Sequence, residues 1–236
     1  MRTPMPSPNN SLEDLKSSPS AREPLLVLAS QSPSRASILN ASGIAFSTIV
    51  SGVDEDAALD RAERERGSSL GPAETAGVLA RAKAEAVAEL PEAAGHLILG
   101  CDSVFELDGV SYGKPYEPEV AISRIRQMSG RTGTLHTGHW LVDCRNTNQE
   151  SNESHGVVRS ADVTFATMSD AEIREYVATE EPLNVAGSFT IEGFGAAFIA
   201  SISGESHTVL GLSVHALREL LAKRGMNITQ LWTRNT

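Results

Sequence analysis

The stretch from Gly100 to Pro115, GCDSVFELDGVSYGKP, constrains the fold more than any other part of this sequence. It follows Leu97–Leu99, a continuous apolar run of the kind that forms a buried strand. Asp108-Gly109 is a strong turn signal, so we expect residues 110–113 to return antiparallel until Pro115 ends the pairing. The sequence therefore predicts a hairpin at the end of a core strand.

This hairpin should bring a carboxylate and an amine together. A three-residue bulged turn would place Lys114 directly opposite Asp102, and a two-residue turn would place it opposite Ser103, one step away. A charge at the end of a core strand needs a partner or a metal, because desolvating it is expensive. From this stretch alone, a structural ion pair and a catalytic site explain the two charges about equally well.

The chain of 236 residues is long enough for one large domain or two small lobes. Residues 1–23 are rich in Pro, Ser and Asn without apolar periodicity, so we predict a disordered tail followed by a single domain over residues 24–236. The net charge of −10 argues against a nucleic-acid partner. A polyanionic ligand would therefore need a locally basic pocket or a bridging cation.

The cysteines and the apolar segments narrow the class of protein further. Cys101 and Cys144 offer neither a disulfide framework nor a metal-ligand spacing, and Cys101 is most simply a core residue. The six histidines form no metal-binding pattern. No segment reaches membrane-spanning length and the N-terminus lacks a secretory signal, so we expect a cytoplasmic enzyme or binding protein with no membrane partner.

A strand that leads directly into a helix forms a second notable feature. Leu25–Ala29 has the pattern of a buried strand. Ser32 is a good N-cap and Pro33 a good first residue for a helix that should run to about Ser42. Such a turn offers free backbone N–H groups to an anion.

Polar side chains at this turn support an anion site. Ser30 and Ser32 could add hydroxyl donors, although the N-cap role is the simpler explanation for Ser32 alone. Arg35 would lie in the first helical turn, where a cation opposes the helix dipole. A bound phosphate would relieve that conflict.

Two further segments hold charges of interest. Residues 72–90 predict an Ala-rich helix, and Lys83 lies in its apolar stripe. Lys83 either extends to solvent, which is the simpler interpretation, or points into the same pocket as Asp102. Residues 52–56, GVDED, predict an acidic loop, most simply solvated, that could hold a divalent cation through Glu55.

The rest of the chain shows strand and helix patterns with polar connections. Ser169 and Glu172 form a capping box, which makes Glu172 structural rather than catalytic. Residues 180–195 are dense in Gly and should wrap the pocket. The other predicted elements are strands at 46–50, 134–142, 157–166, 196–202 and 206–210, helices at 117–128 and 213–224, and an exposed loop at 144–156.

The unusual side chains suit a triphosphate ligand. They are Ser30, Ser32, Arg35, Lys83, Asp102, Lys114 and Arg131. Cations and helix N–H groups would spread the phosphate charge, while a carboxylate would hold a metal or deprotonate an attacking water. No Walker A motif is present, which excludes a P-loop mechanism.

All of these residues except Lys83 lie in motifs that resemble those of the Maf family of nucleotide pyrophosphatases, in order and across the chain from Leu25 to Trp232. LASQSPSR resembles the family's LASxSPRR, GCDSVFELDGVSYGKP its ADT…LDGxxxGKP, and MSGRTGTLHTG its LSGRTHxVxTG. EPLNVAGSFTIEGFG resembles EPLDKAGAYGIQGxG, and VLGLSVHALRELL resembles the closing VGLPLxxLxELL. Each motif alone is weak, but their shared order makes the resemblance specific.

The resemblance implies an α/β fold of two lobes with a mixed sheet and a central cleft, similar to inosine-triphosphate pyrophosphatase. Residues 24–236 would then form one Maf-like catalytic domain. It also implies hydrolysis of a nucleoside triphosphate to the monophosphate and pyrophosphate with a divalent metal, Mg²⁺ or Mn²⁺. The sequence is also compatible with a homodimer.

The resemblance also implies roles for individual residues. Asp102 would be the general base or its metal-linked equivalent, and Arg35, Lys83 and Lys114 would bind phosphates with help from Ser30. The candidate catalytic residues are Asp102, Lys83 and Lys114; the candidate substrate-binding residues are Ser30, Ser32, Arg35, Arg131 and Glu192; the candidate metal ligands are Asp102 and Glu55.

Three departures from the family pattern concern the substrate. Ser34 replaces the first Arg of SPRR, and Asn184-Val185 replaces Asp-Lys. Glu192 stands where pyrimidine-preferring members have Gln. A carboxylate only accepts hydrogen bonds, which suits the N1–H and N2–H₂ donors of guanine, so we predict a guanine-like base.

Three alternatives stay open at this point. The 7-methyl-GTP branch of the family resembles this chain at GSF…EGFG, whereas CDSVFE and GRTGTLHTGH look more like the broad-range nucleoside-triphosphate members. The second alternative is a non-catalytic nucleotide-binding regulator of cell division. An intact Asp102–Lys114 pair argues against it, because a protein that only binds has no need of a base. The third alternative, a structural or interaction module, is disfavoured by the charges on the buried strand.

Overall fold

The structure is a computed structural model that describes residues 24–146 and 153–233. The predicted N-terminal tail, residues 1–23, lies outside the described residues, as does the middle of the loop predicted at 144–156. Within the described ranges, no helix combines the length and the apolar character needed to cross a bilayer.

A seven-stranded sheet forms the centre of the fold, in the order β2-β1-β3-β5-β6-β7, with β4 paired to β3. β1 runs parallel to both of its neighbours, and the other pairings are antiparallel. The strands are β1 (Leu26–Leu28), β2 (Phe46–Thr48), β3 (Leu97–Leu107), β4 (Val110–Tyr112), β5 (Thr132–Asp143), β6 (Glu153–Phe165) and β7 (Ile199–Ser203). A mixed sheet with flanking helices confirms the predicted α/β class.

Helices cover the sheet on both faces, and most of them begin where the sequence predicts. The α-helices are α1 (Pro33–Ala41), α2 (Glu55–Arg66), α3 (Pro72–Ala88), α4 (Pro118–Met128), α5 (Asp170–Ala178), α6 (Ser206–Val209) and α7 (Val214–Lys223). The side chains of Ser32, Ser169 and Ser213 accept N-cap hydrogen bonds at the starts of α1, α5 and α7. The predicted structural role of Glu172 is confirmed by its capping box with Ser169.

The structure corrects several predictions about local structure. Residues 153–156, predicted as part of an exposed loop, belong to β6. Residues 52–56 do not form only a loop, because Asp54 caps α2 and the helix begins at Glu55. α2 has no buried residue and no apolar stripe, so hydrophobic periodicity gave no signal for it. The strand predicted at 206–210 is instead α6, a single helical turn closed by a hydrogen bond from Leu210 N to Ser206 O (3.2 Å).

α3 lies directly on the backbone of β3 and β5. A Cβ atom at Gly100 would come within 2.2 Å of the carbonyl oxygen of Ala80, and one at Gly138 within 2.2 Å of that of Ala76. Only glycine allows so close an approach of helix and sheet. This contact determines where the side chains of α3 meet β3.

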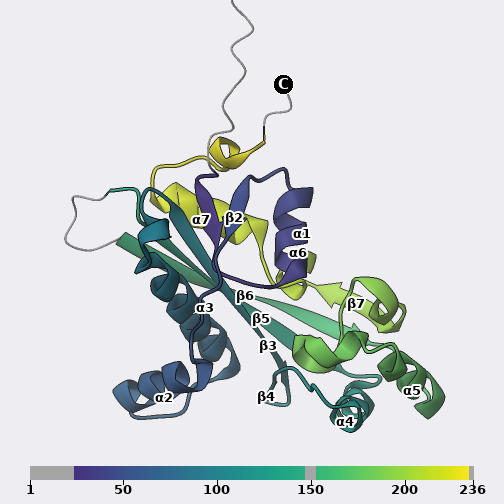
Figure 1. Cartoon of the computed structure of the whole chain (residues 1–236). Helices are drawn as coiled ribbons and strands as arrows, with labels where there is room; N and C mark the ends of the chain where they lie inside the picture. Colours follow the sequence, from purple (N-terminus) through teal and green to yellow (C-terminus); the bar gives the residue numbers. More distant parts are fainter. Residues whose placement is uncertain (1–23, 147–152, 234–236) are drawn as a thin grey trace, which may run out of the picture.

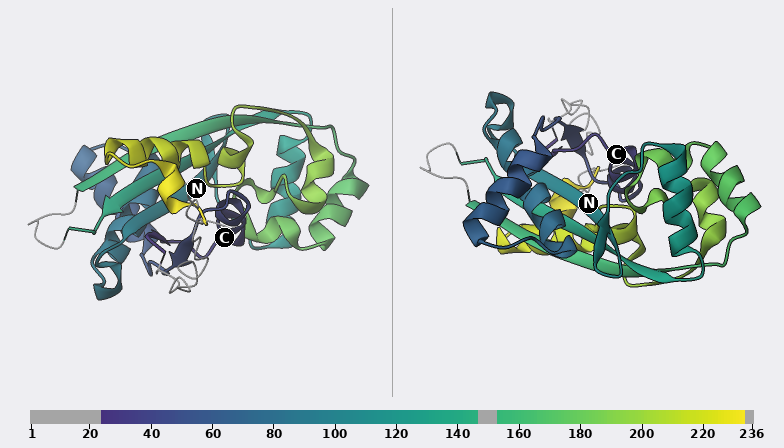
Figure 2. Two further views of the ribbon diagram at one scale, coloured as in Figure 1. Left: turned by 90° about the horizontal axis from the view of Figure 1, so that it is seen from above. Right: turned by 90° about the horizontal axis from the view of Figure 1, so that it is seen from below.

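The elements form two groups along the long strands. Figure 1 shows α1, β2 and α7 toward one end of β3, β5 and β6, and α4 and α5 toward the other. Figure 2 shows the same separation from above and from below. Leu26, Leu39 and Leu217 belong to an apolar cluster of the first group, whereas Phe105 and Phe189 belong to a cluster of the second. A division into two lobes stays a prediction.

Candidate active site

A cavity of about 870 Å³ opens beyond the C-terminal end of β1. Ligands of open α/β sheets bind outside the carboxyl ends of parallel strands. The residues that line it are 29–35, 50–53, 55, 75, 79, 83, 102–104, 111, 113, 114, 116, 135, 184–186, 189, 190 and 209–211. The cavity therefore draws on elements from both groups.

A gap along one edge of β3 explains the position of the cavity. β1 pairs with β3 only as far as Leu99, and β4 begins to pair with it at Phe105. Between these points that edge of β3 has no neighbouring strand. Because peptide groups alternate between the two edges of a strand, those of Cys101 and Ser103 face the gap.

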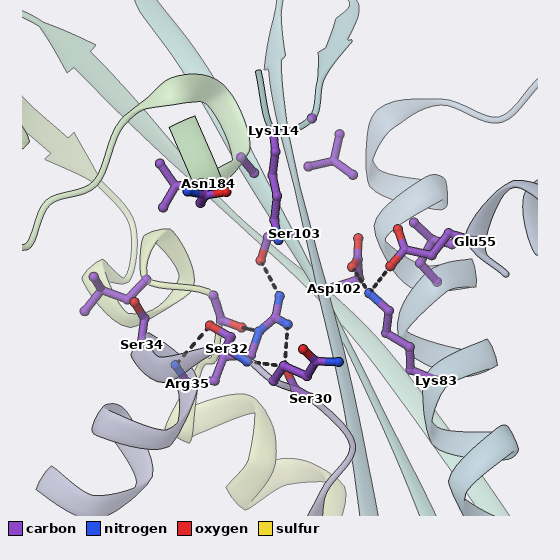
Figure 3. Close-up of a pocket in the computed structure, with 18 of the residues that line it drawn as sticks. Ser30, Ser32, Ser34, Arg35, Glu55, Lys83, Asp102, Ser103, Lys114 and Asn184 are labelled. Carbon is purple, nitrogen blue, oxygen red and sulfur yellow. Dashed lines mark hydrogen bonds and ion pairs between the residues drawn. The ribbon is translucent and has the colours of Figure 1, made fainter. Parts of the chain in front are cut away.

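Lys83 links two carboxylates on one side of the cavity. Its Nζ atom lies 2.5 Å from Oδ1 of Asp102 on β3 and 2.7 Å from Oε1 of Glu55 on α2. Lys83 therefore points into the pocket rather than to solvent. The sequence had left both interpretations open and favoured solvent as the simpler one. Figure 3 shows the ammonium group between the two carboxylates.

Burial and charge compete at this cluster. Burial raises the pKa of Asp102 above its ordinary value, and the nearby charges of Lys83 and Arg35 oppose this only in part. Burial alone would lower the pKa of Lys83, but Asp102 and Glu55 outweigh it, so the pKa of Lys83 is raised. The result is a charged lysine beside a carboxyl group that binds a proton more readily than an exposed aspartate.

Arg35 occupies the other side of the cavity with neutral partners. Its guanidinium donates to Ser30 Oγ (3.0 Å), to Ser103 Oγ (3.2 Å) and to the carbonyl oxygen of Gly211 (2.8 Å). No carboxylate within the described ranges forms an ion pair with it. Arg35 is thus a fixed cation whose charge is left for a ligand.

A chain of hydroxyl groups holds the position of Arg35. Ser103 Oγ lies 2.9 Å from Thr137 Oγ1, and Thr137 Oγ1 donates to the carbonyl oxygen of Thr208 at 2.8 Å. Because Thr137 uses its proton on Thr208, the hydroxyl of Ser103 donates to Thr137 and accepts from Arg35. Neither hydroxyl was predicted as part of the site from the sequence. Side-chain alternation along β3 could have found Ser103, since it must face the opposite side from Asp102.

Lys114 lies in the cavity wall but does not pair with Asp102. The register Leu107 to Val110 shows a two-residue turn, so the bulged-turn alternative is wrong. The β3–β4 ladder ends at Tyr112, which leaves Lys114 beyond the paired residues. Its side chain is exposed and, among the described residues, joins no ion pair. The ion-pair partner of Asp102 is Lys83, 19 residues away in the sequence.

The serines at the start of α1 also line the cavity. Ser32 Oγ accepts from the backbone N–H of Arg35 at 3.4 Å, which confirms its N-cap role. Ser30 Oγ accepts from Ser32 N at 3.2 Å as well as from the Arg35 guanidinium. Figure 3 shows Ser30, Ser32 and Ser34 grouped beside Arg35, on the other side of β3 from Lys83.

The structure separates two predicted substrate-binding residues from the others. Arg131 is outside the cavity lining and forms an exposed pair with Asp108, with Nη2 at 2.5 and 2.6 Å from its carboxylate oxygens. Glu192 is exposed and also outside the lining. The cavity therefore brings together Ser30, Ser32, Arg35, Glu55, Lys83, Asp102 and Lys114, without Arg131 and Glu192.

The chain is similar to known proteins over most of its length. A family model described as Maf-like protein matches residues 25–224. The chain is 47% identical over 208 residues to the nucleoside triphosphate pyrophosphatase of Streptomyces avermitilis, covering 88% of this chain and 94% of that protein. It is 46% identical over 211 residues to the protein of the same name from Leifsonia xyli, covering 89% of this chain and 97% of that protein. It is 40% identical over 213 residues to the protein of that name from Corynebacterium diphtheriae, covering 89% of this chain and 99% of that protein.

Proposed function

Since the chain belongs to the Maf-like protein family, we propose that it hydrolyses nucleoside triphosphates to the monophosphate and pyrophosphate. The observation that carries this proposal is one cavity that combines a buried carboxylate with three cations. Asp102 is the carboxylate, and Lys83, Arg35 and Lys114 are the cations. Such a set can neutralise a triphosphate and activate water in the same space.

The cations have different tasks in this mechanism. Arg35 and Lys114 have no carboxylate partner among the described residues, so both are available to phosphate oxygens. The fixed guanidinium of Arg35 would position one phosphate, and the mobile stem of Lys114 would follow another. Lys83 would keep Asp102 oriented and would stabilise negative charge that develops on the phosphates.

Asp102 acts as the general base. In the described residues, hydrogen bonds reach only its Oδ1 atom, which leaves Oδ2 to accept a proton from water. The water oxygen forms a bond to the α-phosphorus while the bond from that phosphorus to the bridging oxygen breaks, and pyrophosphate leaves. A raised pKa makes the carboxylate a better base near neutral pH.

A divalent cation, Mg²⁺ or Mn²⁺, would be held by Asp102 and Glu55 together with phosphate oxygens of the substrate. Both carboxylates converge on Lys83, and the described residues contain no group of three or more His, Cys, Asp or Glu side chains that could hold a metal alone. Mg²⁺ is commonly bound by one or two carboxylates together with phosphate oxygens and water. Such a cation would neutralise phosphate charge and polarise phosphorus–oxygen bonds.

A nucleotide panel tests the proposal. Pyrophosphate release from GTP, 7-methyl-GTP, UTP and dTTP would be measured with Mg²⁺, with Mn²⁺ and after chelation. Asp102→Asn should lose about 10²- to 10⁴-fold in kcat while the far-UV circular dichroism spectrum is unchanged. Asp108→Asn is the matched control, since Asp108 is exposed and outside the cavity lining, and it should retain activity.

The same panel separates the alternatives. Nucleotide binding without release from any substrate would refute the enzyme and favour the regulator. Selective release from 7-methyl-GTP would assign the chain to that branch. A preference for GTP over UTP and dTTP would support the guanine prediction. That prediction rests on Glu192, a residue outside the cavity lining. The reverse preference would contradict it.

A further inference from the structure

Tyr116 is an aromatic side chain in the wall of the cavity with no partner among the described residues. It is 64% exposed, although it lines the cavity. Its hydroxyl forms no hydrogen bond, and its ring forms no aromatic or cation–π contact, with any described residue. A large aromatic residue left open in a cavity that also holds cations is suited to a flat apolar ligand group.

The backbone at Tyr116 is strained. Its φ is 60°, a conformation that costs energy for a bulky side chain. The N–H of Glu117 donates to the carbonyl oxygen of Pro115 at 2.7 Å, which closes a three-residue γ-turn with Tyr116 at its centre. The N–H of Tyr116 donates to the carbonyl oxygen of Leu183 at 3.0 Å and holds this turn in place. Strain of this kind often marks a ligand clamp.

The position of the ring relative to the cations indicates which part of a nucleotide it would meet. Tyr116 follows Lys114 by two residues, a Cα separation of at most about 7 Å. Its backbone contact with Leu183 places it next to Asn184 and Val185, which also line the cavity. Arg35 and Lys83 lie on other elements, α1 and α3. Tyr116 itself carries no charge for a phosphate, so its ring is available to the base of a nucleotide whose phosphates are held by Arg35 and Lys83.

We propose that Tyr116 stacks on the nucleobase of the substrate. This inference rests on the proposed function and assigns the base contact within the same cavity. Every base has a π-face, so stacking on one aromatic ring is tolerant of base identity. Tyr116 thus supplies affinity for nucleotides in general, a contact that Glu192 cannot supply from outside the cavity lining.

Four variants test the proposal by steady-state kinetics. Tyr116→Ala should raise KM for each nucleotide by roughly ten-fold or more with little change in kcat, because stacking contributes to binding rather than to the chemical step. Tyr116→Phe should retain the wild-type KM, since the hydroxyl has no partner in the described residues. Phe194→Ala is the matched control: Phe194 is 66% exposed but outside the cavity lining.

Tyr116→Gly separates a binding role from a structural one. Glycine adopts positive φ without strain, so this variant should unfold at an equal or higher temperature, by about 1–3 °C, and still show the raised KM. Inorganic tripolyphosphate, which has no base, should inhibit the wild type and Tyr116→Ala with the same inhibition constant.

The outcomes are distinct from those for the proposed function. An active wild type whose KM is unchanged in Tyr116→Ala would overturn the stacking role and leave the enzyme assignment intact. Weaker inhibition of Tyr116→Ala by tripolyphosphate would also overturn it, because the effect would then concern the phosphates. An inactive wild type would refute the proposed function and the inference together.

Discussion

Replacing Lys83 by methionine should shift the pH dependence of catalysis to higher pH. Methionine retains an unbranched stem but removes the ammonium group that lies 2.5 Å from Asp102. The pKa of Asp102 is already raised by burial, and the charge of Lys83 is the largest effect that opposes this. Without that charge the carboxylate takes up a proton more readily, and a protonated Asp102 cannot act as a base.

The structure sets the size of the effect. Both side chains are only 13% exposed, so solvent screens their attraction weakly. Two unit charges about 4 Å apart attract by about 4 kcal/mol at an effective dielectric constant of about 20. Even a third of that energy is a tenfold change in the ratio of ionised to protonated Asp102. The ratio of kcat/KM at pH 6 to that at pH 9 should therefore be lower in the variant than in the wild type, and the effect approaches tenfold where Asp102 is mainly protonated.

The free energy of unfolding should also depend on the charge of Lys83. Leaving a buried carboxylate without its partner costs about 3–5 kcal/mol, less where the group is protonated. Because the pKa of Asp102 is raised in the folded state, that state binds the proton more tightly than the unfolded chain does. This contribution to stability is present at low pH and is lost as pH rises through the folded-state pKa. Urea unfolding should thus show a larger loss for Lys83→Met at pH 8 than at pH 5.

Lys114→Met is the matched control for this experiment. It removes the same charge from the same cavity, but Lys114 is exposed and joins no ion pair within the described ranges. Its KM should rise, while the ratio between pH 6 and pH 9 and the urea midpoint should stay close to the wild type. An unchanged pH profile in Lys83→Met would refute the assignment of Asp102 as the base or of Lys83 as its controlling charge.

Two further predictions concern Arg35 and the packing of α3. Arg35→Lys should raise KM about tenfold, because an ammonium group cannot reproduce the three hydrogen bonds of the guanidinium; equal KM values in initial-rate assays would contradict this. Gly138→Ala should destabilise the fold by about 1–3 kcal/mol or more in urea unfolding, since the added methyl group meets the backbone of α3 at 2.2 Å. Gly113→Ala, which meets no atom within 4 Å, should unfold like the wild type, and equal midpoints for both variants would refute the packing argument.

Local signals in the sequence were sufficient for much of the fold and for part of the site. The N-cap at Ser32, the turn at Asp108-Gly109 and the capping box at Ser169 act over a few residues, so the sequence alone predicted them correctly. Apolar periodicity located α3 and α7 for the same reason. The helix α2 was missed because caps and charges stabilise it without a buried face.

The partners of the charged residues depended on the tertiary structure. The sequence identified Asp102, Lys83, Lys114 and Arg35 as unusual, but it suggested Lys114 as the neighbour of Asp102. Lys83 takes that place because the glycines of β3 and β5 admit α3 to the sheet backbone, a contact between distant parts of the chain. Arg131 was equally prominent in the sequence and lies outside the cavity lining. Residue types and local elements follow from short-range chemistry, whereas the partner of each charge is determined by packing over long sequence separations.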